Sequence, residues 1–212
     1  MYVVIEGVIG VGKTSLARLL QPTFKSNILL EVFEENPFLS KFYEDRDRYA
    51  FQTQMFFLLS RYDQQKRSVP GLLREGLSLI SDYTFNKDAL FASITLNGDE
   101  LEMYSQLHSA LAEKIPAPDL VVYLRAKTDV LMQRITLRDR PYERSMDQGY
   151  IDLVNRAYDA YFLKSDGQSD VLVIDSNDMD FVHNEDDLHC IENSIRQKLQ
   201  LPPFQQELPI AD

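Results

Sequence analysis

The fold of this chain is decided near its start by the stretch Gly7-Val8-Ile9-Gly10-Val11-Gly12-Lys13-Thr14. This stretch fits the pattern G-x-x-x-x-G-K-[ST] at every fixed position. An apolar, β-type run precedes it at 2–5, and a helix-type run that begins with Ser15 follows it at 15–20. Strand, glycine-rich loop and helix in this order are the context that the phosphate-binding P-loop motif requires. We therefore predict a nucleoside-triphosphate site at residues 7–15.

The residue types of this loop suit phosphate chemistry. Gly7, Gly10 and Gly12 allow the backbone to curl, so that several N–H groups face phosphate oxygens, and the following helix adds its positive end. Lys13 can reach the β- and γ-phosphates, and the hydroxyl of Thr14 can ligate Mg²⁺. The sequence thus predicts ATP and Mg²⁺ as ligands. A glycine-rich turn without a ligand is the alternative, but it does not explain the flanking strand and helix.

Length, charge and cysteine content restrict the class of protein. The 212 residues suit a single α/β domain over 1–212. The formal net charge of −11 argues against nonspecific binding to nucleic acid or to an anionic membrane. No apolar run approaches the ~18 residues of a membrane span. Since Cys190 is the one cysteine and no basic leader precedes the first strand, we expect a cytoplasmic location.

Short apolar runs and helical patterns alternate along the chain. The predicted parallel strands are about 2–6, 28–33, 77–81, 119–124 and 171–175. One predicted helix contains residues 51–62, and the others span about 99–114, 128–137, 148–163 and 185–199. This alternation predicts a doubly wound, five-stranded parallel sheet flanked by helices, in which ligands bind beyond the carboxyl ends of the strands. We expect the proline-containing tail 202–212 to be loose or packed on a partner.

Two acidic residues follow predicted strands. Glu31 lies in or at the end of the second strand, where burial of a carboxylate is costly without a function or a partner. It could accept a proton from an attacking hydroxyl, or it could lie at a solvated edge or pair with an arginine. Asp82 directly follows the third strand, which is the usual place of the acidic partner of a P-loop threonine in holding Mg²⁺. Its alternative role is to cap the next helix.

Three arginines end the helix predicted at 128–137. Arg134 and Arg138 are four residues apart on one helical face, and Arg140 follows just before Pro141. Three guanidinium groups this close repel each other unless an anion lies between them, and a phosphoryl group in transfer is such an anion. A solvated basic helix end is the alternative interpretation.

Two polar residues share a face of the helix that contains 51–62. Gln54 and Arg61 are seven residues apart, on the face that also carries Phe51, Leu58 and Tyr62. Polar groups within an aromatic stripe could form paired hydrogen bonds with the edge of a base. Equally, they could be surface residues beside the core.

Several further stretches add to this pattern. They are Glu34-Glu35-Asn36-Pro37-Phe38-Leu39, Phe42-Tyr43, Arg48-Tyr49-Ala50-Phe51-Gln52-Thr53-Gln54, Ser60-Arg61, Ser81-Asp82-Tyr83, Phe85, Lys87-Asp88, Phe91-Ala92 and Asn155-Arg156-Ala157-Tyr158. Together with the P-loop and the arginines, they resemble the deoxyribonucleoside kinases, most closely the bacterial deoxyadenosine/deoxyguanosine kinase branch. The resemblance extends over about residues 2–182. It implies a P-loop kinase fold with a short arginine-rich lid at about 138–147.

The resemblance implies catalytic and phosphate-binding roles for individual residues. Glu31 is expected to activate the 5′-hydroxyl of the nucleoside, with Lys13, Asp82 and Arg134 as the other catalytic residues. Arg134, Arg138 and Arg140 are expected to close on the phosphates of ATP. The implied Mg²⁺ ligands are Thr14, Asp82 and Glu31.

The resemblance also implies how the nucleoside is held. Tyr43 and Glu143 are expected at the sugar 3′-hydroxyl. Gln54 is expected to recognise the base, with Phe85, Phe91 or their neighbours stacking on it. Arg61 and Asp88 resemble the polar pair that adjusts base preference.

The sequence departs from the animal members of the family at two places. They usually carry Glu-Pro at the position of Glu31-Val32, and Glu-Arg-Ser where this chain has Asp82-Tyr83-Thr84. The missing arginine leaves one contact to a phosphate or to the 5′-hydroxyl unassigned.

The expected reaction is ATP-dependent phosphorylation of the 5′-hydroxyl of a deoxyribonucleoside, in nucleotide salvage. A purine is favoured as the base, deoxyadenosine or deoxyguanosine, and deoxycytidine is a further candidate. A thymidylate-type nucleoside monophosphate kinase is the alternative, although Asp82-Tyr83 stands where that family has Asp-Arg. A GTPase-like switch would need Asn-Lys-x-Asp after a strand, which Asn86-Lys87-Asp88 only half resembles.

A homodimer is expected from the same resemblance. The family usually dimerises through helices like those around 50–65 and 99–114. Apolar residues that could form such a face are Phe56, Phe57, Leu101, Met103, Leu107 and Leu111.

Overall fold

Five parallel strands form one sheet in the described part of the chain, as the sequence predicts, and their spatial order is β2-β3-β1-β4-β5. The computed structural model describes residues 1–144, 146–163 and 170–203. The strands are β1 (Tyr2–Gly7), β2 (Asn27–Leu29), β3 (Leu79–Ser81), β4 (Leu120–Arg125) and β5 (Asp170–Asp175). Residues 204–212 of the expected tail and position 145 of the expected lid lie outside the described residues.

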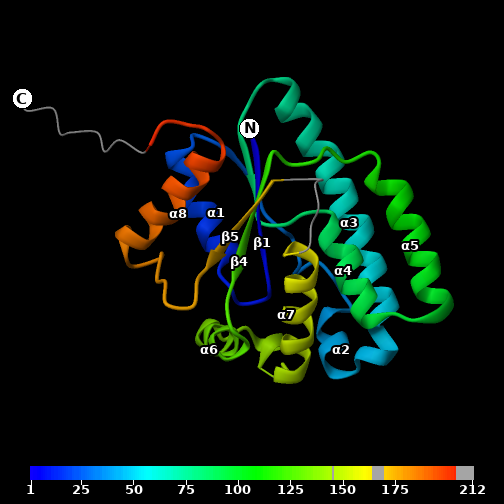
Figure 1. Ribbon diagram of the computed structural model, residues 1–212. Helices are drawn as coiled ribbons and strands as arrows, with labels where there is room; N and C mark the ends of the chain where they lie inside the picture. Colours follow the sequence, from blue (N-terminus) through cyan, green and yellow to red (C-terminus); the bar gives the residue numbers. More distant parts are fainter. Residues whose placement is uncertain (145, 164–169, 204–212) are drawn as a thin grey trace, which may run out of the picture.

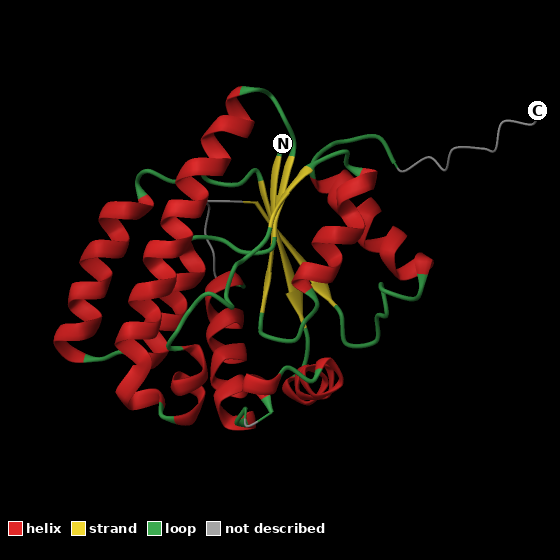
Figure 2. Cartoon of the chain, turned by 180° about the vertical axis from the view of Figure 1, so that it is seen from behind, coloured by secondary structure: helices red, strands yellow, loops and turns green. Residues whose placement is uncertain are grey.

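The helices lie in two groups on opposite faces of the sheet (Figure 1). One group consists of α1 (Lys13–Thr23) and α8 (Glu185–Lys198). The other consists of α3 (Arg46–Arg74), α4 (Asn86–Thr95) and α7 (Gln148–Phe162), with α5 (Gly98–Ala112) on its outer side. Figure 2 shows the same two groups from behind.

The carboxyl ends of the strands point to the end of the molecule where α2 (Leu39–Glu44) and α6 (Thr128–Arg138) lie (Figure 1). A 3₁₀ turn, η1 (Pro141–Glu143), follows α6. No helix in the described part of the chain has the length and apolar character needed to cross a membrane.

Strand β1 lies in the middle of the sheet and is buried along its whole length. Its residues alternate between the two faces, as a strand requires. Val3 and Ile5 belong to the main core cluster, whereas Tyr2 and Val4 belong to a smaller cluster that includes Tyr83. The strand before the P-loop is therefore held from both sides.

The second strand ends earlier than the predicted range 28–33. β2 stops at Leu29, and the backbone N–H of Glu31 donates to Asp82 Oδ1 at 2.8 Å instead of continuing the sheet. The carbonyl of Leu30 accepts a hydrogen bond from Gln64 Nε2 at 2.9 Å. Glu31 therefore lies just beyond the strand, at the carboxyl edge of the sheet.

Helix α4 is not predicted by the sequence pattern. Its neighbours are α3, α5 and α7, so it is covered on several sides. Its buried residues include Leu90 and Ala92 but also Lys87 and Asp88. The apolar positions consequently do not follow a single face, and no amphipathic period is visible.

A buried carboxylate in β1 anchors the loop that leads into α4. Glu6 is fully buried, and its Oε1 accepts hydrogen bonds from the backbone N–H of Thr84 at 2.6 Å and from its hydroxyl at 3.0 Å. Its Oε2 accepts from Gly7 N at 3.2 Å and from the hydroxyl of Tyr158 at 3.3 Å. Glu6 thus joins the end of β1, the loop after β3 and α7.

We expect Glu6→Ala to lower the free energy of unfolding by about 3 kcal/mol, because it leaves the buried donors of Thr84 and Tyr158 without an acceptor. Urea unfolding followed by circular dichroism measures this loss. Glu100→Ala is the control: Glu100 is exposed on α5, and its replacement should change stability by no more than about 0.5 kcal/mol. Equal effects of the two substitutions would contradict the anchoring role of Glu6.

Candidate active site

The P-loop has the backbone geometry that phosphate binding needs. Gly10 and Gly12 have φ values of 89° and 103°, a region that side-chain-bearing residues rarely adopt. A Cβ at Gly10 would lie 2.7 Å from the Ile135 side chain, and one at Gly12 would lie 2.8 Å from the ring of Phe181. Among the described residues no side chain caps the N-terminus of α1, so its first N–H groups remain available to an anion.

The side chains of the loop divide between the core and the pocket. Val8 and Val11 are buried in the hydrophobic core, so that only their backbone can contact a phosphate. Ile9, Gly10, Lys13 and Thr14 line a pocket at the carboxyl edge of the sheet. The Ser15 side chain is exposed.

Lys13 is folded over its own loop. Its ammonium donates to the carbonyls of Gly7 at 2.7 Å and of Val8 at 3.2 Å. Burial, followed by the charge of Lys87, lowers the pKa of Lys13 to about 8. The ammonium is thus held beside the place where phosphates would bind, with no carboxylate contacting it among the described residues.

Asp82 connects the P-loop to Glu31. Its Oδ2 accepts a hydrogen bond from the Thr14 hydroxyl at 2.5 Å, and its Oδ1 accepts the backbone N–H of Glu31 at 2.8 Å. Asp82 does not cap the next helix, because the N-cap position of α4 is Phe85 and no side chain accepts a hydrogen bond there. A hydroxyl beside a carboxylate is an oxygen donor set that suits Mg²⁺.

Glu31 is held by two cations. Its Oε1 accepts from Arg61 Nη2, and its Oε2 accepts from Lys87 Nζ at 2.6 Å. Burial alone would raise the pKa of Glu31, but the charges and hydrogen bonds of Arg61 and Lys87 outweigh burial and hold it well below its usual range. Of the alternatives that the sequence left open, pairing with an arginine is therefore present.

Arg61 bridges two carboxylates. Besides Glu31, it forms an ion pair through Nη1 with Asp88, whose side chain is completely buried. Its guanidinium also lies over the ring of Phe57, 4.3 Å from the centroid. Asp88 thus holds Arg61 in place. Asp88 itself is not among the described residues that line the pocket.

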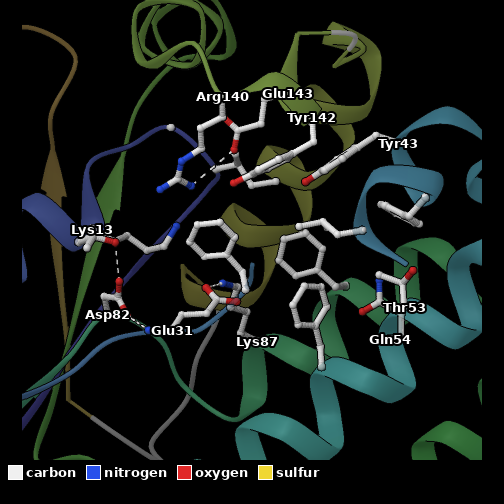
Figure 3. Close-up of a pocket in the computed structure, with 18 of the residues that line it drawn as sticks. Lys13, Glu31, Tyr43, Thr53, Gln54, Asp82, Lys87, Arg140, Tyr142 and Glu143 are labelled. Atoms are coloured by element: carbon white, nitrogen blue, oxygen red, sulfur yellow. Dashed lines mark hydrogen bonds and ion pairs between the residues drawn. The ribbon is translucent and has the colours of Figure 1, made fainter. Parts of the chain in front are cut away.

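Much of the rest of the pocket wall is aromatic. The rings that line it are Phe33, Phe42, Tyr43, Phe57, Phe91, Tyr142 and Tyr150. Gln54 lies among them on α3 and is 3% exposed, with no hydrogen bond from its side-chain amide to another described residue (Figure 3). An apolar wall with one free amide group suits a flat heterocycle that has hydrogen-bonding edges.

The expected lid residues lie along one rim of the pocket. The rings of Tyr43 and Tyr142 stack with centroids 6.3 Å apart. Glu143 is buried and accepts hydrogen bonds from Arg138 Nη2 at 2.7 and 2.8 Å, while Arg140 Nη1 lies 3.8 Å from its Oε1. Figure 3 shows Arg140, Glu143, Tyr142 and Tyr43 following one another along this rim. Both arginines therefore converge on a carboxylate.

Two residues that the sequence assigned to the site lie elsewhere in the described structure. Arg134 donates to the carbonyls of Ser176 at 2.6 Å and Met179 at 3.1 Å, so it supports the loop after β5. Phe85 is 5% exposed, and its ring stacks on His108 with centroids 4.8 Å apart. Neither side chain lines the pocket, whereas Phe91 does.

Sequence reasoning missed the role of Lys87 and most of the aromatic wall. Lys87 is 8% exposed, and its ammonium contacts Glu31. The available signal was a lysine next to an acidic residue at the start of a segment that follows a strand. Without a visible helical period for α4, this signal did not indicate which side chains turn inward.

Comparisons with known proteins agree with this geometry. The family model for deoxynucleoside kinases matches residues 3–200. A deoxyguanosine kinase of Bacillus subtilis (strain 168) is 33% identical, over 92% of this chain and 96% of that protein. A deoxyadenosine/deoxycytidine kinase of the same organism is 27% identical, over 92% of this chain and 90% of that protein. A solved structure of a deoxyadenosine kinase from M. mycoides matches the fold with a TM-score of 0.80 at 23% identity, over 93% of this chain and all of that one. The chain is therefore an enzyme that belongs to the deoxynucleoside kinase family.

Proposed function

We propose that this chain transfers the γ-phosphoryl group of ATP to the 5′-hydroxyl of a purine 2′-deoxynucleoside, with deoxyguanosine as the preferred acceptor. The observation that carries the proposal is the position of Glu31 in one continuous pocket. The P-loop residues Lys13 and Thr14 lie at one end, and Gln54 lies in the aromatic end. A nucleoside whose base reaches Gln54 would thus present its 5′-hydroxyl near Glu31 and the P-loop.

The donor phosphates would bind at the P-loop. The N–H groups at the start of α1 and the ammonium of Lys13 would contact phosphate oxygens. Thr14 and Asp82 would hold Mg²⁺, which would supply positive charge to neutralise the phosphates. We assign Mg²⁺ to these two residues and not to Glu31, because Glu31 is paired with the cations Arg61 and Lys87, whereas Asp82 accepts hydrogen bonds only from uncharged donors among the described residues.

Glu31 would act on the acceptor hydroxyl. The 5′-oxygen forms a bond to the γ-phosphorus while the bond from that phosphorus to the β-phosphate oxygen breaks. The proton of the 5′-hydroxyl passes to the Glu31 carboxylate, and ADP leaves. Tyr43 and Glu143 would hold the sugar, which is supported by their places on the same rim.

The base would be recognised by Gln54 and Arg61. The amide of Gln54 offers both a donor and an acceptor, which suits either purine. Guanine presents the acceptors O6 and N7, which match guanidinium donors, whereas adenine places an amino donor at the corresponding edge. Arg61 lines the pocket, and its guanidinium keeps further N–H donors besides those paired with Glu31 and Asp88, so it favours guanine. Relatives at 31–33% identity that carry the name deoxyguanosine kinase support the same choice.

The segment 138–147 would act as a lid over the phosphates. Arg138 and Arg140 line the pocket, and both are paired with Glu143 in this structure. A phosphoryl group in transfer would compete with Glu143 for these guanidinium groups. Arg134 would hold the loop after β5, whose Phe181 ring lies against Gly12 of the P-loop.

We also propose a cytoplasmic homodimer. Exposed apolar side chains on the two helices expected at the interface support the dimer: Leu59 on α3 is 49% exposed and Met103 on α5 is 59% exposed. Phe57, which the sequence placed on that face, lines the pocket instead. The unpaired, exposed Cys190 is consistent with a reducing compartment.

Phosphoryl transfer from labelled ATP to the four deoxynucleosides tests the proposed reaction. We expect 5′-monophosphate from deoxyguanosine at the highest kcat/KM and from deoxyadenosine at a lower one, since Arg61 favours guanine. A dTMP arm tests the monophosphate kinase alternative, and a reaction without acceptor measures hydrolysis. Transfer only to dTMP, or hydrolysis of ATP with no transfer, would contradict the proposal.

We expect Glu31→Gln to lower kcat by about 10²-fold or more, because the amide cannot take the proton of the 5′-hydroxyl. Deoxyguanosine binding, measured by calorimetry, should change little, since Gln54 and the aromatic wall remain. Glu35→Gln is the matched control, because Glu35 is an exposed carboxylate of the same loop. Turnover of Glu31→Gln close to that of the control would exclude Glu31 as the base.

A further inference from the structure

Lys87 lies at the junction of the two halves of the pocket. It is in the first turn of α4, and its backbone N–H donates to the Thr84 hydroxyl at 3.2 Å. Its ammonium contacts Glu31 Oε2 at 2.6 Å and lies 5.8 Å from the centroid of the Phe91 ring. Figure 3 shows Lys13, Asp82, Glu31 and Lys87 along the same side of the pocket.

The two cations on Glu31 differ in how firmly they are held. Arg61 is also paired with the fully buried Asp88, and moving it would leave that carboxylate uncompensated. For Lys87, Glu31 is the only carboxylate in contact with the ammonium within the described residues. An ammonium has three donors, and the lysine stem is flexible. Lys87 can therefore exchange its partner, whereas Arg61 cannot do so at low cost.

Two ammonium groups border the part of the pocket where the phosphoryl group would be transferred. Lys13 approaches from the P-loop and Lys87 from α4, and both line the pocket. The charge of Lys87 is, after burial, a cause of the lowered pKa of Lys13. Such like charges favour an anion between them.

The residue that follows Asp82 cannot supply this charge. Tyr83 stands where the animal relatives are expected to carry an arginine, and its ring is completely buried in the smaller core cluster. Its hydroxyl donates to Gln64 Oε1 at 2.6 Å. The Tyr83 side chain therefore points away from the pocket. Lys87 remains as the basic residue in contact with Glu31 that can change its partner.

We propose that Lys87 binds the phosphoryl group in transfer from the acceptor side, and that it leaves Glu31 for this group when both substrates are bound. The inference rests on the proposed kinase reaction and adds a phosphate-binding residue to it. Lys87 only changes the oxygen to which its ammonium donates. Its departure also frees Glu31 Oε2 to accept the proton of the 5′-hydroxyl. One movement of Lys87 thus assists both the 5′-oxygen, which loses its proton, and the phosphoryl group, which gains a hydrogen-bond donor.

Lys87→Met tests this inference, because methionine keeps most of the side-chain length and removes the charge. We expect kcat to fall by about 10²-fold, as for loss of one preorganised donor to a transition-state oxygen. The Kd for deoxyguanosine should stay within about threefold, whereas the Kd for dGMP, the product that retains the phosphoryl group, should rise about tenfold or more. Lys87→Arg should restore most of the kcat and most of the affinity for dGMP. Lys114→Met is the control, since Lys114 is exposed after α5.

The binding measurements separate phosphate contact from mere support of Glu31. Equal weakening of deoxyguanosine and dGMP in Lys87→Met, or unchanged dGMP binding, would overturn the inference. If Lys87→Met does not fold, as judged by thermal unfolding, Lys87→Gln gives the same comparison, because its amide can still donate to Glu31 without the charge. Failure of the wild-type chain to phosphorylate deoxynucleosides would instead refute the proposed reaction, so the two failures are distinguishable.

Discussion

The carboxylate of Asp82 joins the P-loop to the segment that carries Glu31, and the rest of the site depends on this link. One oxygen accepts the hydroxyl of Thr14 at the P-loop, and the other accepts the backbone N–H of Glu31 after β2. This contact draws the chain out of the sheet at Leu29 and sets Glu31 beside the P-loop. Strands β2, β3 and β1 are adjacent and parallel, so their carboxyl ends meet at one edge. Donor and acceptor functions can therefore share a single pocket.

Charge balance explains how two largely buried carboxylates are tolerated at the pocket and why the pocket would respond to phosphate. Glu31 and Asp88 are compensated by Arg61 and Lys87, so the buried cluster carries no large net charge. Burial of such ions is tolerated only when each one is paired. A phosphoryl group that enters this cluster adds negative charge. Lys87, which is paired with Glu31 alone among the described carboxylates, would move towards it.

The pocket is also electrostatically distinct from the rest of the surface. Five basic side chains line it against three carboxylates, although the whole chain has a formal net charge of −11. A cleft of locally positive character attracts a nucleoside triphosphate, whereas the acidic exterior does not favour polyanions such as nucleic acid. We therefore expect a preference for a small anion to depend on where the charges lie and not on their total.

Much of this architecture could be predicted from the sequence, because it depends on local patterns. The P-loop has a fixed spacing, and Asp82 directly follows a short apolar strand, so the positions of both relative to the sheet were predictable. The five strands were predictable as well, although β2 is shorter than its apolar run suggests, because the contact with Asp82 is a long-range one. Residue patterns also singled out Glu31, Gln54 and Arg61.

The remainder depends on tertiary packing. Helix α4 is covered on several sides and shows no amphipathic period, so neither the helix nor the inward direction of Lys87 was visible. Arg134 and Arg138 share a helical face by spacing, yet Arg134 is bound by carbonyls of the loop after β5 and Arg138 by Glu143. Phe85 packs on His108, a partner that only the folded chain brings near.

A crystal structure with deoxyguanosine and a non-hydrolysable ATP analogue tests the proposed geometry of phosphoryl transfer. We expect the base at Gln54, the 5′-oxygen within hydrogen-bond distance of Glu31, the triphosphate on the P-loop, and the Lys87 ammonium on the γ-phosphate. A nucleoside whose 5′-oxygen lies away from Glu31, or phosphates bound elsewhere than on the P-loop, would contradict it.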